Sequence, residues 1–338
     1  MVKARKYVVK KDFDGVPKRE DFEIVEYELP PIKNGEILVK VEWVSVDPYM
    51  RVYRPHPVPY DQLGFQVGLV IESKTHKYPV GTRVVSHKGW CDYLIIDTNN
   101  PYPDDDVFDE IYKLPKLGDF PNSLGIGAVG MPGASAYFGF LDICEPKAGE
   151  TVVVTGAAGA VGSIVGQIAK IKGCRVIGFA GSDDKVKWLE EIGFDKAINY
   201  KTVDIKTALQ EAAPNGVDCY FDNVGGEISS IIIYQMNRHG RVSVVGSISA
   251  YNEDLNKMPK ATILQLALID KQLKIQGFEI TDPNVRKRQP KGHKQLIKWI
   301  QSGQLKVREH VTEGFENIYD AFVGMLKGEN IGKAVVKL

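Results

Sequence analysis

Residues 151–170 (TVVVTGAAGAVGSIVGQIAK) constrain the fold of this chain more than any other stretch. Residues 151–155 are mostly β-branched, which is typical of a parallel strand buried on both faces. Glycines follow at 156, 159 and 162, and an apolar helical pattern begins directly after them. This order of strand, glycine turn and helix predicts the first crossover of a doubly wound parallel α/β sheet of the Rossmann type, which binds a dinucleotide.

The glycines of this turn have different expected tasks. Gly159 lets the backbone approach a pyrophosphate, and Gly162 lets the following helix pack close to the strand. The helix N-terminus supplies free N–H donors to phosphate oxygens. Ala157 stands where a strict G-x-G-x-x-G motif has its first glycine, so Gly156 is expected to turn the chain, and the alternative is an ordinary tight turn. The predicted phosphate loop consists of Gly156, Ala158, Gly159, Ala160, Val161 and Gly162.

The next strand and helix indicate which dinucleotide binds. Residues 175–180 (RVIGFA) read as the second strand, after which NAD enzymes keep an acidic residue for the ribose hydroxyls. Here Ser182 resembles an N-cap, and Asp183 and Asp184 suit the first turn of a helix. Lys185 then becomes the candidate for a 2′-phosphate, which predicts NADP rather than NAD. Two alternatives stay open: Lys185 as a solvated helix lysine, and Asp183 turned back toward a ribose.

Composition excludes several classes of protein. The chain has 43 Lys and Arg and 43 Asp and Glu, and this zero net charge argues against a nucleic-acid-binding surface. We expect the short basic run at 286–288 to be a solvated loop, and the acidic 101–106 to be an exposed loop. No apolar run reaches membrane-spanning length, and the first residues lack the apolar core of a signal peptide. We therefore expect a cytoplasmic protein that binds no membrane.

The cysteines and histidines give no metal signature. The four cysteines are scattered singly, without a C-x-x-C pair, and the six histidines show no metal-ligand spacing. We expect neither a closed zinc site nor a disulfide framework, and we expect each histidine to be a surface or structurally satisfied residue.

The chain is long enough for two domains with separate cores. Residues 1–122 are β-rich, and 36–46 alternate between apolar and polar side chains as a half-buried strand does. From 123 to 302 strands and helices alternate, which predicts the dinucleotide-binding domain. Within it, 273–280 reads as an edge strand that could pair with a second subunit. Residues 303–338 are expected to return to the first domain through a helix at 315–327 and a strand at 333–338.

Several motifs together resemble the prostaglandin reductases, a zinc-free family of medium-chain reductases. The resemblance covers nearly the whole chain. It implies a GroES-like barrel for the first domain and a homodimer. Zinc alcohol dehydrogenases have Gly-His-Glu where this chain has Gly64, Phe65 and Gln66, so the resemblance implies chemistry without a metal. The motifs lie at 46–51 (VDPYMR), 129–133 (VGMPG), 136–139 (AYFG), 157–162 (AAGAVG), 220–226 (YFDNVGG) and 314–317 (GFEN).

The resemblance implies NADPH-dependent reduction of the carbon–carbon double bond in α,β-unsaturated aldehydes and ketones. Its implied substrates are 2-alkenals and 15-oxo-prostaglandins, and oxidation of the leukotriene B4 12-hydroxyl is a further activity of the family. Hydride would add to the β-carbon, negative charge would develop on the carbonyl oxygen as an enolate, and a proton would add at the α-carbon. Two other hypotheses remain: an NADPH:quinone reductase of the same superfamily, and a crystallin-like protein that binds NADPH without turnover.

The resemblance also implies roles for individual residues. Tyr251 would lie near the nicotinamide and donate to the enolate oxygen, and Tyr49 is a second catalytic candidate; the alternative for both is packing. The polar residues that follow Phe278 depart from the family pattern and leave the preferred lipid open. Each implied cofactor contact has a turn or cap role as its alternative, and these contacts are Lys185, Tyr200, Asn223, Gly246, Ser247, Tyr251, Phe278 and Asn330.

Overall fold

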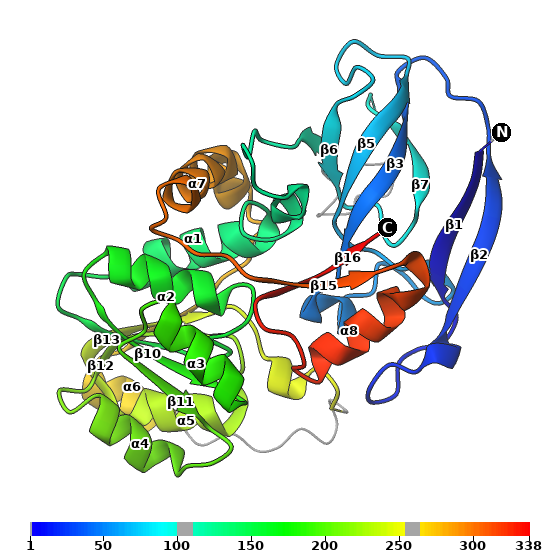
Figure 1. Cartoon of the computed structure of the whole chain (residues 1–338). Helices are drawn as coiled ribbons and strands as arrows, with labels where there is room; N and C mark the ends of the chain where they lie inside the picture. Colours follow the sequence, from blue (N-terminus) through cyan, green and yellow to red (C-terminus); the bar gives the residue numbers. More distant parts are fainter. Residues whose placement is uncertain (1, 100–110, 254–263) are drawn as a thin grey trace. The chain divides into compact units, whose positions relative to one another are not determined.

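The computed structural model describes residues 2–99, 111–253 and 264–338 (Figure 1). The chain forms two compact units. The β-rich unit comprises Met1–Gly127, Glu309–Asn330 and Ala334–Leu338, and the α/β unit comprises Ala128–Arg308 and Ile331–Lys333. The predicted loop at 101–106 lies outside the described residues. None of the described helices combines the length and the apolar character needed to cross a membrane.

The α/β unit is built on a six-stranded parallel sheet, which confirms the predicted fold class. Its strand order is β11-β10-β9-β12-β13-β14, so the chain reverses direction across the sheet between β9 and β12. Ligands of open α/β sheets bind beyond the carboxyl ends of the strands at such a switch point. The strands are β9 (Thr151–Val154), β10 (Arg175–Ala180), β11 (Lys196–Asn199), β12 (Val217–Asp222), β13 (Met236–Val244) and β14 (Lys274–Gly277).

Figure 1 shows helices on both sides of this sheet. Ser182 caps α3 as predicted, because its Oγ accepts the Lys185 N–H at 3.4 Å. Asp204 caps α4 in the same way, accepting the Thr207 N–H at 2.8 Å. The helices of the unit are α1 (Met131–Cys144), α2 (Gly162–Ile171), α3 (Asp183–Glu191), α4 (Ile205–Ala212), α5 (Gly226–Tyr234), α6 (Gln265–Lys271) and α7 (Pro283–Gln301).

Helix α7 corrects one expectation. The basic run at 286–288 lies inside this helix and is not a loop. Asp282 caps the helix at its start, and Val285, Leu296 and Trp299 form part of its buried face. Pro290 and the many charged residues hide this apolar periodicity in the sequence. The Arg288 guanidinium pairs with Asp142 of α1 at 2.5 Å.

The β-rich unit contains two antiparallel sheets. One has the order β2-β1-β4, and the other has the order β15-β16-β3-β5-β6-β8 with β7 also paired to β3. The strands are β1 (Val2–Val9), β2 (Phe22–Leu29), β3 (Glu36–Ser45), β4 (Tyr60–Asp61), β5 (Gln66–Ser73), β6 (Arg83–Ser86), β7 (Tyr93–Asp97), β8 (Ile111–Lys113), β15 (Glu309–Glu313) and β16 (Lys333–Lys337).

The β-rich unit includes Glu309–Asn330 and Ala334–Leu338 from the end of the chain. Strand β16 pairs with β3, and Val335 lies opposite Ser45. Helix α8 (Ile318–Leu326) contributes Phe322, whose ring lies 5.4 Å from that of the buried Trp90. The Tyr7 ring packs edge-on against the same Trp90 at 5.6 Å. Aromatic packing therefore joins residues from the beginning and the end of the sequence in one core.

Candidate cofactor and active site

The predicted phosphate loop connects β9 to α2. Gly156 has a φ of +58°, a conformation that glycine adopts readily. A Cβ on Gly162 would lie 2.5 Å from Gly156 O and 2.8 Å from Ala157 Cα, so the helix starts at a position where only glycine fits. A Cβ on Gly159 would meet only Gly156 O, at 3.2 Å, which leaves the outer side of the loop open to a ligand. All six predicted loop residues lie in this connection: Gly156, Ala158, Gly159, Ala160, Val161 and Gly162.

A segment from the end of the chain is attached to this loop. Gly332 forms a parallel bridge with Gly159, and its N–H donates to Ala158 O at 2.8 Å. A Cβ on Gly332 would lie 2.0 Å from Arg308 O, so a glycine is required there. Asn330 is two residues before this attachment in the sequence, and its predicted ligand contact stays a prediction.

The carboxyl ends of β12 and β13 bring together four of the predicted residues: Asn223, Gly246, Ser247 and Tyr251. Asn223 Nδ2 donates to Thr155 O at 2.8 Å, which joins the end of β12 to the end of β9. A Cβ on Gly246 would lie 2.9 Å from Asn223 O, so these two loops are in close contact. The Ser247 N–H donates to the Tyr251 hydroxyl oxygen at 3.3 Å. Because this oxygen accepts a hydrogen bond, the Tyr251 O–H proton is available for another acceptor.

Asp222 organises these loops, and the sequence reasoning missed it. It is 3% exposed. Its Oδ1 accepts the N–H groups of Val224 and Gly225 at 3.0 and 2.9 Å and the Thr155 hydroxyl at 3.2 Å, and its Oδ2 accepts the Ser229 hydroxyl at 2.6 Å. The usable signal was an aspartate at a strand end with glycines three and four positions later, a pattern in which the side chain caps the turn.

Lys185 lies at the start of α3 in a positively charged site that Tyr200 and Lys201 border, which we call the Lys185 corner. It is half-buried, and burial followed by repulsion from Lys201 lowers its pKa below the ordinary value. A Cβ on Gly181 would lie 3.0 Å from the Tyr200 hydroxyl and 3.3 Å from Lys201 Cε, so Tyr200 and Lys201 border the same turn. The sequence reasoning identified Lys185 and Tyr200 but missed Lys201. An anion in this corner would meet two lysines and the N-terminus of a helix.

The Asp183 carboxylate is held by another side chain, whereas in NAD enzymes an acidic residue after this strand binds the ribose hydroxyls. Its Oδ1 accepts a hydrogen bond from Asn199 Nδ2 at 2.8 Å. Asn199 Oδ1 in turn accepts the Lys201 N–H at 3.1 Å. The acid is therefore held between α3 and the end of β11, which favours the reading of Asp183 as a helix-end charge.

Phe278 follows the edge strand β14. Its N–H donates to Val244 O at 2.9 Å, so any backbone contact with a ligand would use its carbonyl oxygen. Its ring packs over α1, where a Cβ on Gly139 would lie 3.3 Å from Phe278 Cγ.

Tyr49 belongs to the β-rich unit, in a 3₁₀ turn at Pro48–Arg51. Its hydroxyl oxygen lies 2.8 Å from His87 Nε2. His87 is 1% exposed, and its ring centroid lies 4.6 Å from that of Phe65. The sequence reasoning treated every histidine as structural and did not connect His87 with Tyr49, which is 38 positions away.

The site fits a dinucleotide with a 2′-phosphate better than a metal. The glycine cradle leaves room for a pyrophosphate, and the Lys185 corner suits an additional phosphate dianion. In the part of the chain that the structure describes, no three His, Cys, Asp or Glu residues come together as a metal-binding group. Phe65, at the position of a zinc ligand in the related dehydrogenases, packs on His87.

Two family models match the chain. Residues 5–103 match the N-terminal domain of oxidoreductase, and residues 160–300 match a family described as zinc-binding dehydrogenase. The crystal structure of CurA from Vibrio vulnificus in complex with NADPH aligns with a TM-score of 0.89 at 36% sequence identity, covering 98% of each chain.

Two sequence relatives extend over almost the whole chain. The NADPH-dependent curcumin reductase of Escherichia coli (strain K12) is 36% identical and covers 99% of this chain and 96% of its own length. Prostaglandin reductase 1 of Bos taurus is 49% identical, with complete coverage of both chains. Identity of this extent shows that the chain belongs to the prostaglandin reductase family of the medium-chain dehydrogenase/reductase superfamily.

Proposed function

We propose that this protein is an NADPH-dependent reductase of carbon–carbon double bonds conjugated to an aldehyde or ketone. Its substrates are 2-alkenals and 15-oxo-prostaglandin-like enones. The observation that carries the proposal is the 49% identity to prostaglandin reductase 1 over the full length of both chains. The cradle at Gly159 and Gly162 and the cationic corner at Lys185 support the choice of cofactor.

Bound NADPH supplies a hydride to the β-carbon of the substrate. The loop from Gly156 to Gly162 and Asn223 hold the pyrophosphate and the ribose, and Lys185, Lys201 and Tyr200 surround the 2′-phosphate. Gly246, Ser247 and the Phe278 carbonyl would position the nicotinamide end, and Asn330 would reach in from the C-terminal segment.

Tyr251 stabilises the oxygen of the substrate on which charge develops. The Ser247 N–H occupies a lone pair of the Tyr251 hydroxyl oxygen, which leaves the O–H proton to donate to the enolate oxygen. A donor fixed in advance stabilises this charge more in the transition state than in the ground state.

Tyr49 is the second catalytic candidate, and its hydroxyl oxygen lies 2.8 Å from His87 Nε2. The Tyr49 O–H would transfer its proton to the α-carbon. The phenolate that remains would keep a hydrogen bond from an Nε2–H of His87 until a solvent proton restores the phenol.

A cytoplasmic location is part of this proposal. All four cysteines are buried free thiols. Proteins of reducing compartments keep their thiols in this state.

The activity itself is tested by following NADPH oxidation with a 2-alkenal, a 15-oxo-prostaglandin, a para-quinone and the matching saturated aldehyde. We expect turnover of the first two with a product that has lost its double bond and kept its carbonyl group. A chelator should leave the rate unchanged. An alcohol product, a quinone as the best substrate, or loss of activity on chelation would contradict the proposal.

The cofactor assignment predicts that Lys185→Ala weakens NADPH binding by about tenfold to a hundredfold, since a charge-assisted phosphate contact is lost. NADH binding should change less than twofold, roughly the effect of a surface substitution. Fluorescence titration with both cofactors measures the two constants. Lys187→Ala, on the exposed side of the same helix, is the matched control. Equal weakening of both cofactors would show that Lys185 does not meet the 2′-phosphate.

The catalytic assignment predicts that Tyr251→Phe lowers kcat by roughly a hundredfold while the Kd for NADPH stays within about twofold. Tyr49→Phe should also lower kcat, and it should change the solvent isotope effect because it removes the proposed proton donor. Tyr234→Phe in α5 serves as the control. Stopped-flow measurements of hydride transfer separate these effects from product release. Unchanged rates in both variants would assign the two tyrosines to packing.

We also infer a homodimer that forms through β14, the edge strand of the parallel sheet. All four residues of β14 are exposed, and helix α6, which precedes β14 in the chain, exposes Leu266 and Ile269 by 68% and 75%. An exposed strand edge next to apolar side chains favours pairing with a second copy.

Gly277→Pro should produce monomers, since it removes a backbone donor from the free edge of β14, whereas the Phe278 N–H faces β13. Sedimentation velocity measures the oligomeric state, and Val80→Lys, at an exposed position of the β-rich unit, is the control. A wild-type monomer at micromolar concentration, or a Gly277→Pro dimer, would refute this interface.

A further inference from the structure

Helix α7 carries a row of lysines that the proposed reductase site does not use. Lys287, Lys291, Lys294 and Lys298 follow one another at intervals of four, three and four positions, which places them on one side of an α-helix. All four residues are exposed. At a rise of about 1.5 Å per residue, the row is about 16 Å long. We call this straight, positively charged surface the lysine row.

The opposite side of α7 anchors the helix in the α/β unit. Val285, Leu296 and Trp299 are buried on that side. Helix α7 lies against α1 (Figure 1), and the Trp299 ring centroid is 5.9 Å from that of Tyr137 in α1. The helix is therefore amphipathic, and packing of its apolar side leaves the lysine row on the solvent side.

No acidic residue offsets the lysine row within α7. The chain has 43 acidic residues, but none lies between 283 and 301, where six are Lys or Arg. Solvated helices usually carry charges of both signs, because like charges three or four positions apart destabilise a helix. The composition of α7 thus differs from that of an ordinary solvated helix.

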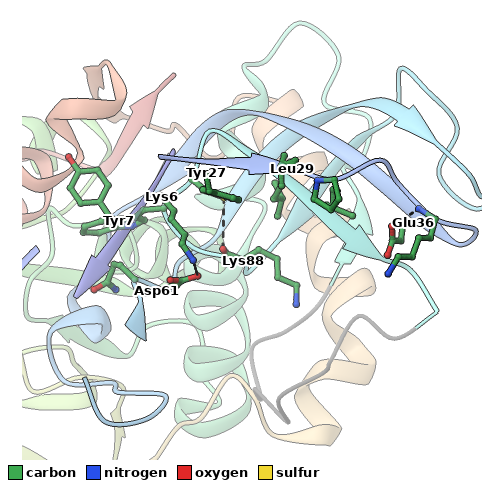
Figure 2. A pocket seen from close by; sticks show the side chains of 14 residues that line it. Lys6, Tyr7, Tyr27, Leu29, Glu36, Asp61 and Lys88 are labelled. Atoms are coloured by element: carbon green, nitrogen blue, oxygen red, sulfur yellow. Dashed lines mark hydrogen bonds and ion pairs between the residues drawn. The ribbon is translucent and has the colours of Figure 1, made fainter. Parts of the chain in front are cut away.

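Other lysines of the protein have acidic partners. Lys170 Nζ pairs with Asp195 Oδ2 at 2.8 Å. At the cavity in the β-rich unit that Figure 2 shows, Lys6 Nζ pairs with Asp61 Oδ2 at 2.8 Å. Among the residues that the structure describes, none forms an ion pair with a member of the lysine row. Neighbouring ammonium groups about one helical turn apart lie within the Debye length of about 8 Å, so they repel one another until an anionic partner arrives.

The chemistry of the lysine row favours a lipid surface over a nucleic acid. The exposed residues of α7 include no aromatic side chain, whereas proteins that bind single-stranded nucleic acids combine basic residues with aromatic side chains for base stacking. Lysine ammonium groups act as point charges, while arginine forks select individual phosphates or carboxylates. Several lysines on an amphipathic helix are typical of contact with anionic lipids. The exposed residues of α7 also include no large aliphatic side chain that could enter a bilayer.

We propose that the lysine row binds the surface of an anionic phospholipid bilayer, reversibly and by electrostatic attraction alone. Each lysine near such a surface contributes about fivefold to binding. The sequence-based expectation of no membrane contact concerned spanning and signal segments, which this binding does not need. The apolar chains of the proposed substrates enter bilayers, so the bound enzyme would meet them at a higher concentration. That consequence rests on the proposed function, whereas the binding itself does not.

The test is co-sedimentation of the full chain, saturated with NADP⁺, with vesicles. Equimolar phosphatidylcholine and phosphatidylserine should bind the protein saturably, and phosphatidylcholine alone should bind it at least about tenfold more weakly. Lys291→Gln combined with Lys294→Gln should weaken binding to the anionic vesicles about 25-fold, since two charges of the row are lost. Salt at about 1 M, where the Debye length is about 3 Å, should release the protein.

Lys172→Gln combined with Lys206→Gln is the control, because it removes two charges from exposed positions of the α/β unit outside α7. This variant should bind like the wild type, and circular dichroism verifies that both double variants are folded. The proposal is overturned if anionic vesicles do not bind, if phosphatidylcholine alone binds equally well, or if the two double variants bind alike. Tighter binding of a single-stranded RNA than of the anionic vesicles would assign the row to nucleic acid and would also overturn it.

Discussion

The candidate site depends on the hydrogen bonds that the Asp222 carboxylate accepts. It is buried at the end of β12 and accepts hydrogen bonds from two backbone N–H groups and two hydroxyls. One of these hydroxyls belongs to Thr155 at the end of β9, so a single side chain joins the two strands that flank the switch point. These four hydrogen bonds lie in a low-dielectric interior, and they fix the loops in which a cofactor would lie before any ligand arrives.

The parts of the site that could be predicted are local in sequence. A β-branched strand, a glycine turn and a helix follow one another within twenty residues, so their chemistry and their geometry appear in the same window. Ser182 and Lys185 were identified for the same reason, since a cap and the first turn of a helix are neighbours in the chain. Lys201 was missed because it reaches the Lys185 corner only through the register of β10 and β11, which places Asn199 beside Ala180.

Other features could not be predicted because antiparallel pairing or irregular segments bring distant residues together. Tyr49 and His87 meet across 38 positions, and no local pattern joins a turn tyrosine to a loop histidine. Helix α7 was missed for a different reason, since Pro290 and the charged residues around it obscure the periodicity of its buried face. The family resemblance supplied Tyr49, but it gave no indication of His87.

The Lys185 corner also suggests how the protein distinguishes its cofactor. Repulsion from Lys201 adds to burial in lowering the pKa of Lys185, which means that the free protein holds two charges that oppose each other. In the proposed site, a 2′-phosphate would relieve this repulsion in addition to forming its own contacts, whereas a ribose hydroxyl would leave it in place. Selectivity for NADPH would then arise partly from the repulsion between Lys185 and Lys201 in the empty site. Because Lys201 is exposed, dissolved salt screens this repulsion more than it screens the phosphate contact at the half-buried Lys185.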